Sequence, residues 1–241
     1  MTTNPHIHST SDLSLDYAKV VLYGPPGSGK TTMASTFPDV LFLSAESGLL
    51  SVRDKAIDIW EITAWEDLEE AFGYLRAGEH KYKSVVIDSL TEVQKKLNEH
   101  IVKKFPGKRR DYEDLMSMSD WGYAIDRMRR LCRAFRDLPM NVVFIALEVA
   151  EITEEETFIK PALSGKTLSD ELMGWVDAVV YCAGPQKDED GNVRYLGQTV
   201  PGKGRRAKIR VPAGTHVPSV IELGFDNLYR VMFPEKTGEA A

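Results

Sequence analysis

The sequence predicts an α/β domain in which helices flank a mainly parallel central sheet, followed by a C-terminal antiparallel β extension. Short apolar runs typical of buried strands alternate with helical patterns along most of the 241 residues. A glycine-rich stretch at 24–31 joins the first apolar run to the first helix. Near the end of the chain, turn signals and short strand patterns favour antiparallel pairing instead.

The glycine-rich stretch reads Gly-Pro-Pro-Gly-Ser-Gly-Lys-Thr and fits G-x-x-x-x-G-K-[ST] at every fixed position. The run 20–23 before it predicts a strand, and residues 32–37 after it predict a helix that Pro38 ends. Glycines let successive backbone N–H groups point at one anion, and the helix adds its positive N-terminal end. An ordinary glycine turn is the alternative, but a complete match in this context disfavours it. The stretch therefore predicts a nucleoside triphosphate site.

We expect ATP and Mg²⁺ at this site. In this motif the lysine, Lys30, reaches the β- and γ-phosphates, and the hydroxyl of Thr31 is a ligand for Mg²⁺. The expected nucleotide-binding residues are Gly24, Pro25, Pro26, Gly27, Ser28, Gly29, Lys30, Thr31 and Thr32.

The composition is that of a packed globular protein, with 43% hydrophobic and 27% charged residues. Acidic residues outnumber basic ones by 36 to 30, and the net charge of −6 does not favour strong nonspecific binding to duplex nucleic acid. No apolar stretch is long enough to cross a membrane, and the N-terminus lacks the pattern of a signal peptide. Cys132 and Cys182 have no metal-ligand spacing, which favours reduced thiols in a cytoplasmic protein.

The chain has no internal repeat and no clear linker, so we expect one domain over 18–234. Its polar ends, 1–17 and 235–241, are predicted to be flexible tails.

Two more strands are predicted after the glycine-rich stretch, a buried one at 40–44 and an alternating one at 57–62. Glu46 lies just beyond the first of them. Thr63 and Glu66 have the spacing of a capping box and predict the start of a helix.

The run 85–88 predicts a buried strand that ends in a carboxylate, Asp88. Downstream of a phosphate-binding loop, such an aspartate is the second part of the site and holds Mg²⁺, usually through a water. Ser89 and Glu92 predict the cap of the next helix, whose buried face contains Leu90, Val93, Leu97 and Ile101.

The densest basic cluster of the chain follows this helix, in a loop with Pro106 and Gly107. One interpretation is contact with a nucleic-acid backbone, with Phe105 or Tyr112 available to stack on bases. The other is a solvated surface loop, since most charge runs are only that. The basic residues concerned are Lys103, Lys104, Lys108, Arg109 and Arg110.

The later elements are predicted by the same patterns. They are a helix from Ser119 or Asp120 to Phe135, a strand at 141–147, a helix at 168–175, a strand at 176–182 and a return strand at 195–200. Residues 151–156 predict an acidic connector, and residues 160–167 predict a loop. Glu148 follows the strand 141–147, and a second basic run, 202–210, enters a further strand.

This order of parts resembles the RecA-like ATPase core over residues 18 to about 225, and looks closest to the Sak-type phage proteins, a group of single-strand annealing ATPases. The resemblance implies that Glu46 is the general base that activates the attacking water, and that Asp88 is the Mg²⁺-associated aspartate. It also implies that Lys208 and Arg210 reach the γ-phosphate of a neighbouring subunit.

The function implied by the resemblance is ATP hydrolysis coupled to action on single-stranded DNA in phage-type recombination or annealing. A homo-oligomer, a single-strand-binding protein as a further partner, and the host cytoplasm for a phage-encoded chain are part of this expectation. The segments after Ile101 and from Ala150 to Thr167 correspond to the two DNA-binding loops of the RecA core. Two features depart from the pattern: Leu147 stands where a polar γ-phosphate sensor is usual, and residues 151–156 are acidic.

Other functions stay open. A nucleotide-gated module that loads or binds a partner in phage DNA replication, without direct action on DNA, fits the net acidity and the missing polar sensor. A small-molecule kinase needs an arginine-rich lid, which residues 205–210 mimic, although in a β-rich region. An AAA+ motor is disfavoured because the sequence predicts no C-terminal helical lid domain.

Overall fold

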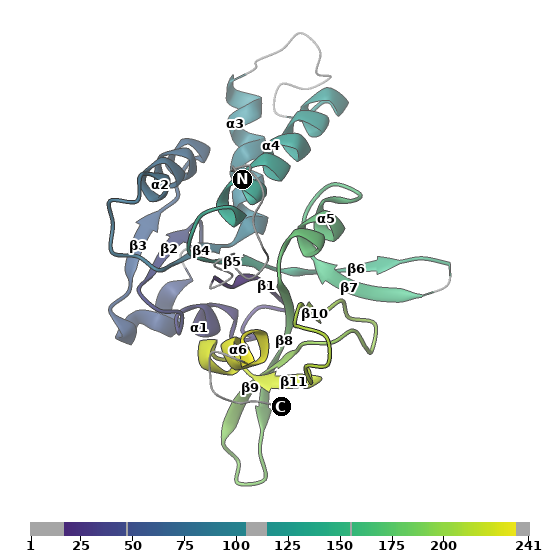
Figure 1. Cartoon of the computed structure of the whole chain (residues 1–241). Coiled ribbons are helices and arrows are strands. Elements are labelled where there is room, and N and C mark those ends of the chain that lie inside the picture. The colour runs from purple at the N-terminus through teal and green to yellow at the C-terminus, as the bar shows by residue number, and fades with distance from the viewer. Residues whose placement is uncertain (1–16, 47, 105–114, 155, 235–241) are drawn as a thin grey trace, which may run out of the picture.

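A nine-stranded sheet forms the centre of the computed structural model, which describes residues 17–46, 48–104, 115–154 and 156–234. The strand order is β11-β9-β8-β1-β5-β4-β2-β3, and β10 also pairs with β8 (Figure 1). The predicted tails lie outside the described residues except for residue 17, and so do Lys108, Arg109 and Arg110.

Parallel pairing joins six strands of this sheet, as the sequence predicts. β1 lies between β5 and β8, and β4 lies between β5 and β2, which also pairs with β3. Near-continuous apolar sequences suit strands that are covered on both faces. Their bounds are β1 (Lys19–Tyr23), β2 (Val40–Ser44), β3 (Asp58–Glu61), β4 (Ser84–Asp88), β5 (Asn141–Ala146) and β8 (Ala178–Lys187).

The predicted C-terminal antiparallel extension is also confirmed. β9 (Val193–Gln198) and β10 (Lys208–Ile209) pair antiparallel with β8, and β11 (Val220–Glu222) pairs antiparallel with β9.

Helices cover both faces of the sheet and bury two apolar clusters there. α2 (Trp65–Ala77), α3 (Leu90–Lys104), α4 (Met118–Arg136) and α5 (Leu168–Trp175) contribute to one cluster. α1 (Lys30–Ala34) and α6 (Phe225–Met232) contribute to the other, and a 3₁₀ helix, η2 (Leu49–Lys55), follows β2. Among the described residues, no helix has the length and apolar character needed to span a membrane.

Two predicted helix starts were wrong by a few residues. Asp67, and not Glu66, caps α2, because its Oδ2 accepts hydrogen bonds from the backbone N–H of Thr63 (2.7 Å) and Ala64 (2.8 Å). The Glu66 carboxylate pairs with His100 instead. Ser117 caps α4 by accepting from the N–H of Asp120 at 3.2 Å, so the helix begins at Met118, one or two residues earlier than expected.

The predicted connector around 151–156 is instead part of a two-stranded antiparallel hairpin. β6 (Glu148–Ile152) pairs with β7 (Thr157–Pro161), and the hairpin, here called the arm, projects beside α5 (Figure 1). The sequence of β6 has no apolar alternation with a buried face, because Val149 and Ile152 are exposed while Glu148 and Glu151 are partly buried. Lys160 of β7 is buried, and its Nζ pairs with Glu151 of β6 at 2.5 Å and with Asp170 of α5 at 3.1 Å.

Candidate nucleotide-binding site

The phosphate-binding loop connects the end of β1 to the start of α1, at the edge where the parallel strands end. Open α/β sheets bind ligands at this edge. A side chain at Gly24 would place its Cβ 2.3 Å from the carbonyl oxygen of Cys182, so glycine alone fits there. Gly27 and Gly29 have φ values of +73° and +85°, which disfavour other residues. The backbone therefore requires each of the three glycines.

A cavity of about 600 Å³ opens at this loop. Residues 26–32 line it, together with Glu46 from beyond β2 and Asp88 from the end of β4. Gly24 and Pro25 do not line it, but their carbonyl oxygens accept hydrogen bonds from Lys30 Nζ. The fold thus brings the predicted residues of three separate segments to one cavity.

Lys30 is a buried cation whose contacts suit an anion site. Only 8% of the residue is exposed, and its Nζ donates to the carbonyl oxygens of Gly24 (3.0 Å) and Pro25 (2.7 Å). Burial lowers the pKa of Lys30, because the charged form loses solvation. No carboxylate within the described residues forms an ion pair with it. A phosphate would supply the missing negative charge.

Thr31 and Asp88 meet at the cavity, where Thr31 Oγ1 donates to Asp88 Oδ2 at 2.8 Å. Burial, with a smaller effect of the nearby Glu46 carboxylate, raises the pKa of Asp88 to about 6, against the opposing effects of the Thr31 hydrogen bond and the Lys30 charge. Oxygen ligands of this kind suit Mg²⁺. The described residues hold no group of three or more His, Cys, Asp or Glu that would bind an ion alone. The donor set therefore fits an ion that is shared with phosphates and water.

Binding of Mg²⁺ with nucleotide should weaken as the pH falls through about 6. Below that pH Asp88 carries a proton because its pKa is raised to about 6, and the ion must displace this proton. Affinity should level off above pH 7 and fall roughly tenfold for each unit below the pKa. Titrations with a fluorescent ATP analogue from pH 5 to 8 measure this. Asp88→Asn is the control, since only the nucleotide's own titration remains in it; equal pH profiles would contradict the prediction.

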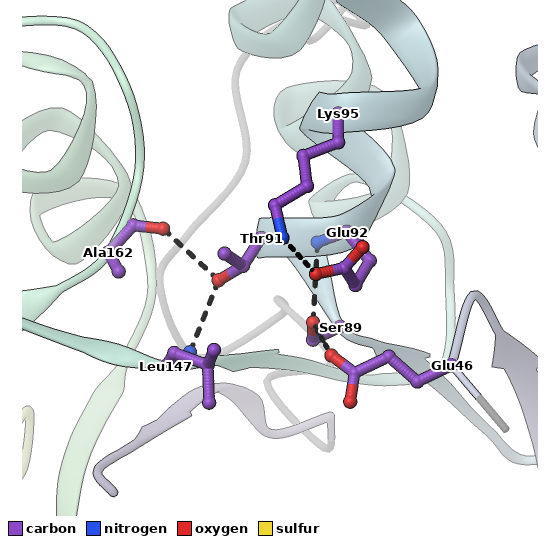
Figure 2. A network of polar contacts seen from close by, with 7 residues as sticks. All are labelled: Glu46, Ser89, Thr91, Glu92, Lys95, Leu147 and Ala162. Atoms are coloured by element: carbon purple, nitrogen blue, oxygen red, sulfur yellow. Dashed lines mark hydrogen bonds and ion pairs between the residues drawn. The ribbon is translucent and has the colours of Figure 1, made fainter. Parts of the chain in front are cut away.

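Glu46 is placed beside Asp88 by backbone and side-chain contacts. Ala45 N–H donates to the carbonyl oxygen of Asp88 at 2.7 Å, and Ser44 Oγ donates to the carbonyl oxygen of Glu46 at 2.6 Å. Ser89 Oγ donates to the Glu46 carboxylate at Oε1 (Figure 2). Glu46 therefore lines the same cavity as Asp88 and Ser89.

Lys208 and Arg210 do not join this site within one chain. β10 pairs with the first residues of β8, away from the end where the phosphate-binding loop lies. Lys208 Nζ donates to the carbonyl oxygen of Gly174 at 3.4 Å, and Arg210 pairs with Asp177 at 3.3 Å.

Of the predicted basic cluster, Lys103 and Lys104 are exposed at the end of α3.

Sequence reasoning missed Tyr195. This residue of β9 lines the cavity, and a Cβ on Gly29 would lie 2.7 Å from its ring. No local pattern marks it, because only the pairing of β9 with β8 brings it to the loop.

Tyr195→Ala should weaken ATP binding about tenfold, while Tyr195→Phe should bind as wild type does. The ring lies next to Gly29 in the lining of the cavity, and stacking of a base on an aromatic ring contributes about 1–3 kcal/mol. Titration with a fluorescent ATP analogue measures the change, with Tyr123→Ala on α4 as an exposed control. Unchanged affinity in Tyr195→Ala would show that the ring does not contact the nucleotide.

Comparison with known families agrees with this site. A family model described as an AAA domain matches residues 16–211. The chain belongs to this family. The matched region contains the phosphate-binding loop, Glu46 and Asp88, so the domain is a P-loop core of the ATPase type, with the predicted RecA-like arrangement. After β8 the described residues contain one helix, α6, which lies beyond the matched region.

Solved structures similar in fold have low identity to this AAA domain. An ATPase from the type III secretion system of pathogenic bacteria matches at 11% identity and a TM-score of 0.44, over 68% of this chain and 51% of that one. A KaiC-like protein from Pyrococcus horikoshii OT3 matches at 13% identity and a TM-score of 0.45, over 85% of this chain and 89% of that one. The flagellar accessory protein FlaH from Methanocaldococcus jannaschii matches at 9% identity and a TM-score of 0.41, over 85% of this chain and 84% of that one. The chain thus spans about half of the secretion-system ATPase. No curated protein matched the sequence.

Proposed function

We propose that this AAA domain hydrolyses ATP at the 600 Å³ cavity and uses the hydrolysis to act on single-stranded DNA, as in phage-type annealing or recombination. The observation that carries the hydrolytic part is the meeting of Lys30, Thr31, Asp88 and Glu46 at one cavity. The Sak-type group remains the family resemblance that best fits this role.

In the proposed reaction each residue has a separate task. The loop N–H groups and Lys30 bind the triphosphate and hold the γ-phosphate for in-line attack. Thr31 and Asp88 would hold Mg²⁺, which neutralises charge on the phosphates. Glu46 orients a water and accepts its proton.

Lys208 and Arg210 are proposed to stabilise the transition state of a neighbouring subunit. Arg210 lies at the surface, and neither cation reaches the loop of its own chain. This part of the proposal requires a homo-oligomer, so the hydrolysis rate per subunit should rise with protein concentration.

The DNA part of the proposal rests on the end of α3. A groove of about 360 Å³ between α3 and the start of α2 is lined by Lys96, His100, Lys103 and Lys104, with Glu66 and Glu99 between them. His100 lies four residues after Lys96, and Lys103 and Lys104 lie three and four residues after His100, so these side chains share one side of the helix. The α2 N-terminus adds a partial positive charge. These groups suit the phosphates of a strand.

Combined Lys103→Ala and Lys104→Ala should reduce the stimulation of ATP hydrolysis by single-stranded DNA. Two fewer phosphate contacts should also lower the slope of log affinity against log salt by about 1.4. Hydrolysis assays and fluorescence anisotropy with a labelled oligonucleotide across a salt series measure both. The matched control is Lys81→Ala with Lys83→Ala, whose cations pair with Asp58 and Asp39. If wild-type protein neither binds nor responds to DNA, this part of the proposal fails.

The arm favours the second candidate, a nucleotide-gated module for a protein partner. Its exposed carboxylates, Glu154 and Glu156, repel nucleic acid, and Lys160 is held in ion pairs. Ile152 is 79% exposed near the end of β6. A hydrolysis rate that is unaffected by DNA but changes with a basic protein partner would support this candidate.

The structure does not favour the kinase alternative, because Arg205 and Arg206 stack on aromatic rings and form no lid.

A further inference from the structure

We propose that Ser89 is a positioning residue for Glu46, which it holds by one carboxylate oxygen so that the other faces the attacking water; the inference rests on the proposed function. Glu46 is exposed and follows β2 outside any helix or strand, so its side chain needs an anchor. Ser44 fixes only its backbone, through the hydrogen bond to the Glu46 carbonyl oxygen.

The anchor of the carboxylate is the Ser89 hydroxyl, which donates to Oε1 (Figure 2). Within the described part of the chain, Oε2 has no hydrogen-bond partner. In sites that activate a nucleophile, a third group commonly holds the base through one of its atoms, and the base accepts the proton through another atom. Oε2 is therefore the atom that would accept the proton of the water.

Ser89 itself sits on a rigid support. It is 2% exposed, its Oγ accepts from the N–H of Glu92 at 3.4 Å, and its carbonyl oxygen accepts from the N–H of Val93 at 3.0 Å. These contacts fix it at the start of α3, directly after Asp88. One short segment thus positions both the Mg²⁺-associated carboxylate and the base.

The start of α3 is also fixed from its other side. Thr91 Oγ1 accepts from the N–H of Leu147 at 3.2 Å and donates to the carbonyl oxygen of Ala162 at 3.1 Å (Figure 2). Leu147 precedes the arm and Ala162 follows it. A group held this firmly keeps its partner in a productive geometry, and a misplacement of about 1 Å in a reacting group can cost 100-fold in rate.

The test is a set of single-turnover rates with Mg²⁺ and ATP. Ser89→Ala should lower the rate about 10- to 100-fold while the dissociation constant for ATP stays within about twofold of wild type. Ser89→Thr, which keeps the hydroxyl, should recover most of the rate. In a Glu46→Gln background, Ser89→Ala should cause no further loss, because the residue acts only through Glu46.

A structural role would look different. Ser84 is a matched control, since it is buried at the other end of β4 and its Oγ donates to the Pro38 carbonyl oxygen at 2.6 Å. Ser84→Ala should lower the melting temperature without changing the rate. The inference is overturned if Ser89→Ala changes only the melting temperature, or if its loss of rate is undiminished in the Glu46→Gln background. Absence of hydrolysis by wild-type protein would overturn the proposed function instead.

Discussion

Lys30→Ala is expected to abolish ATP hydrolysis and to weaken ATP binding by roughly 30- to 5,000-fold. The ammonium is buried, and within the described structure its hydrogen bonds go to neutral groups of its own segment, so it is ready to pair with phosphate. Removing one partner from a desolvated charge pair costs about 2–5 kcal/mol. Equilibrium titration with a fluorescent ATP analogue and a phosphate-release assay measure the two effects.

Lys19→Ala is the matched control for this prediction. Its Nζ also donates to two carbonyl oxygens, those of Leu138 and Met140, both at 2.6 Å, and burial lowers its pKa to about 8. It lies at the opposite end of β1, so its loss should reduce stability and leave ATP affinity unchanged. If the two variants bound ATP equally well, the assignment of Lys30 to the phosphates would be wrong.

Glu46→Gln should lower the hydrolysis rate by about 100- to 10,000-fold and leave ATP binding intact. Glutamine keeps the shape of the side chain and its hydrogen bond from Ser89, but it cannot accept the proton of the attacking water. Rates from single-turnover assays, with the ATP dissociation constant measured separately, separate the chemical step from binding.

Glu148→Gln is the comparison that this prediction needs, because Glu148 is the other acid at the same edge of the sheet. Its Oε2 is buried and has no hydrogen-bond partner in the described structure, but Glu148 does not line the cavity. We expect Glu148→Gln to retain most of the activity. A large loss in Glu148→Gln with little change in Glu46→Gln would transfer the role of base to Glu148.

The sequence predicted those parts of the fold that local patterns encode. The match at 24–31 and the apolar runs at β1, β2, β4 and β5 depend on neighbouring residues alone, and they place the cavity at the end of the central strands. Asp88 was predicted from a local pattern as well, because it ends a buried strand downstream of the phosphate-binding loop.

Features that depend on distant contacts were missed or misplaced. The arm was predicted as a connector because its strands have little apolar alternation, and Lys160 is buried only by pairing with Glu151 and Asp170. Tyr195 reaches Gly29 through the pairing of β9 with β8, which no spacing reveals. The cap positions differ from the prediction because other nearby side chains accept the hydrogen bonds of the free N–H groups, as Asp67 does on α2.

Phosphate release from ATP by the wild-type chain, measured with and without Mg²⁺ over a series of protein concentrations, tests the central claim most directly. We predict release that requires Mg²⁺, is lost in Lys30→Ala, and rises per subunit as concentration increases. ATP that binds with Mg²⁺ at the cavity but is never hydrolysed, at any concentration and with single-stranded DNA present, would contradict the account.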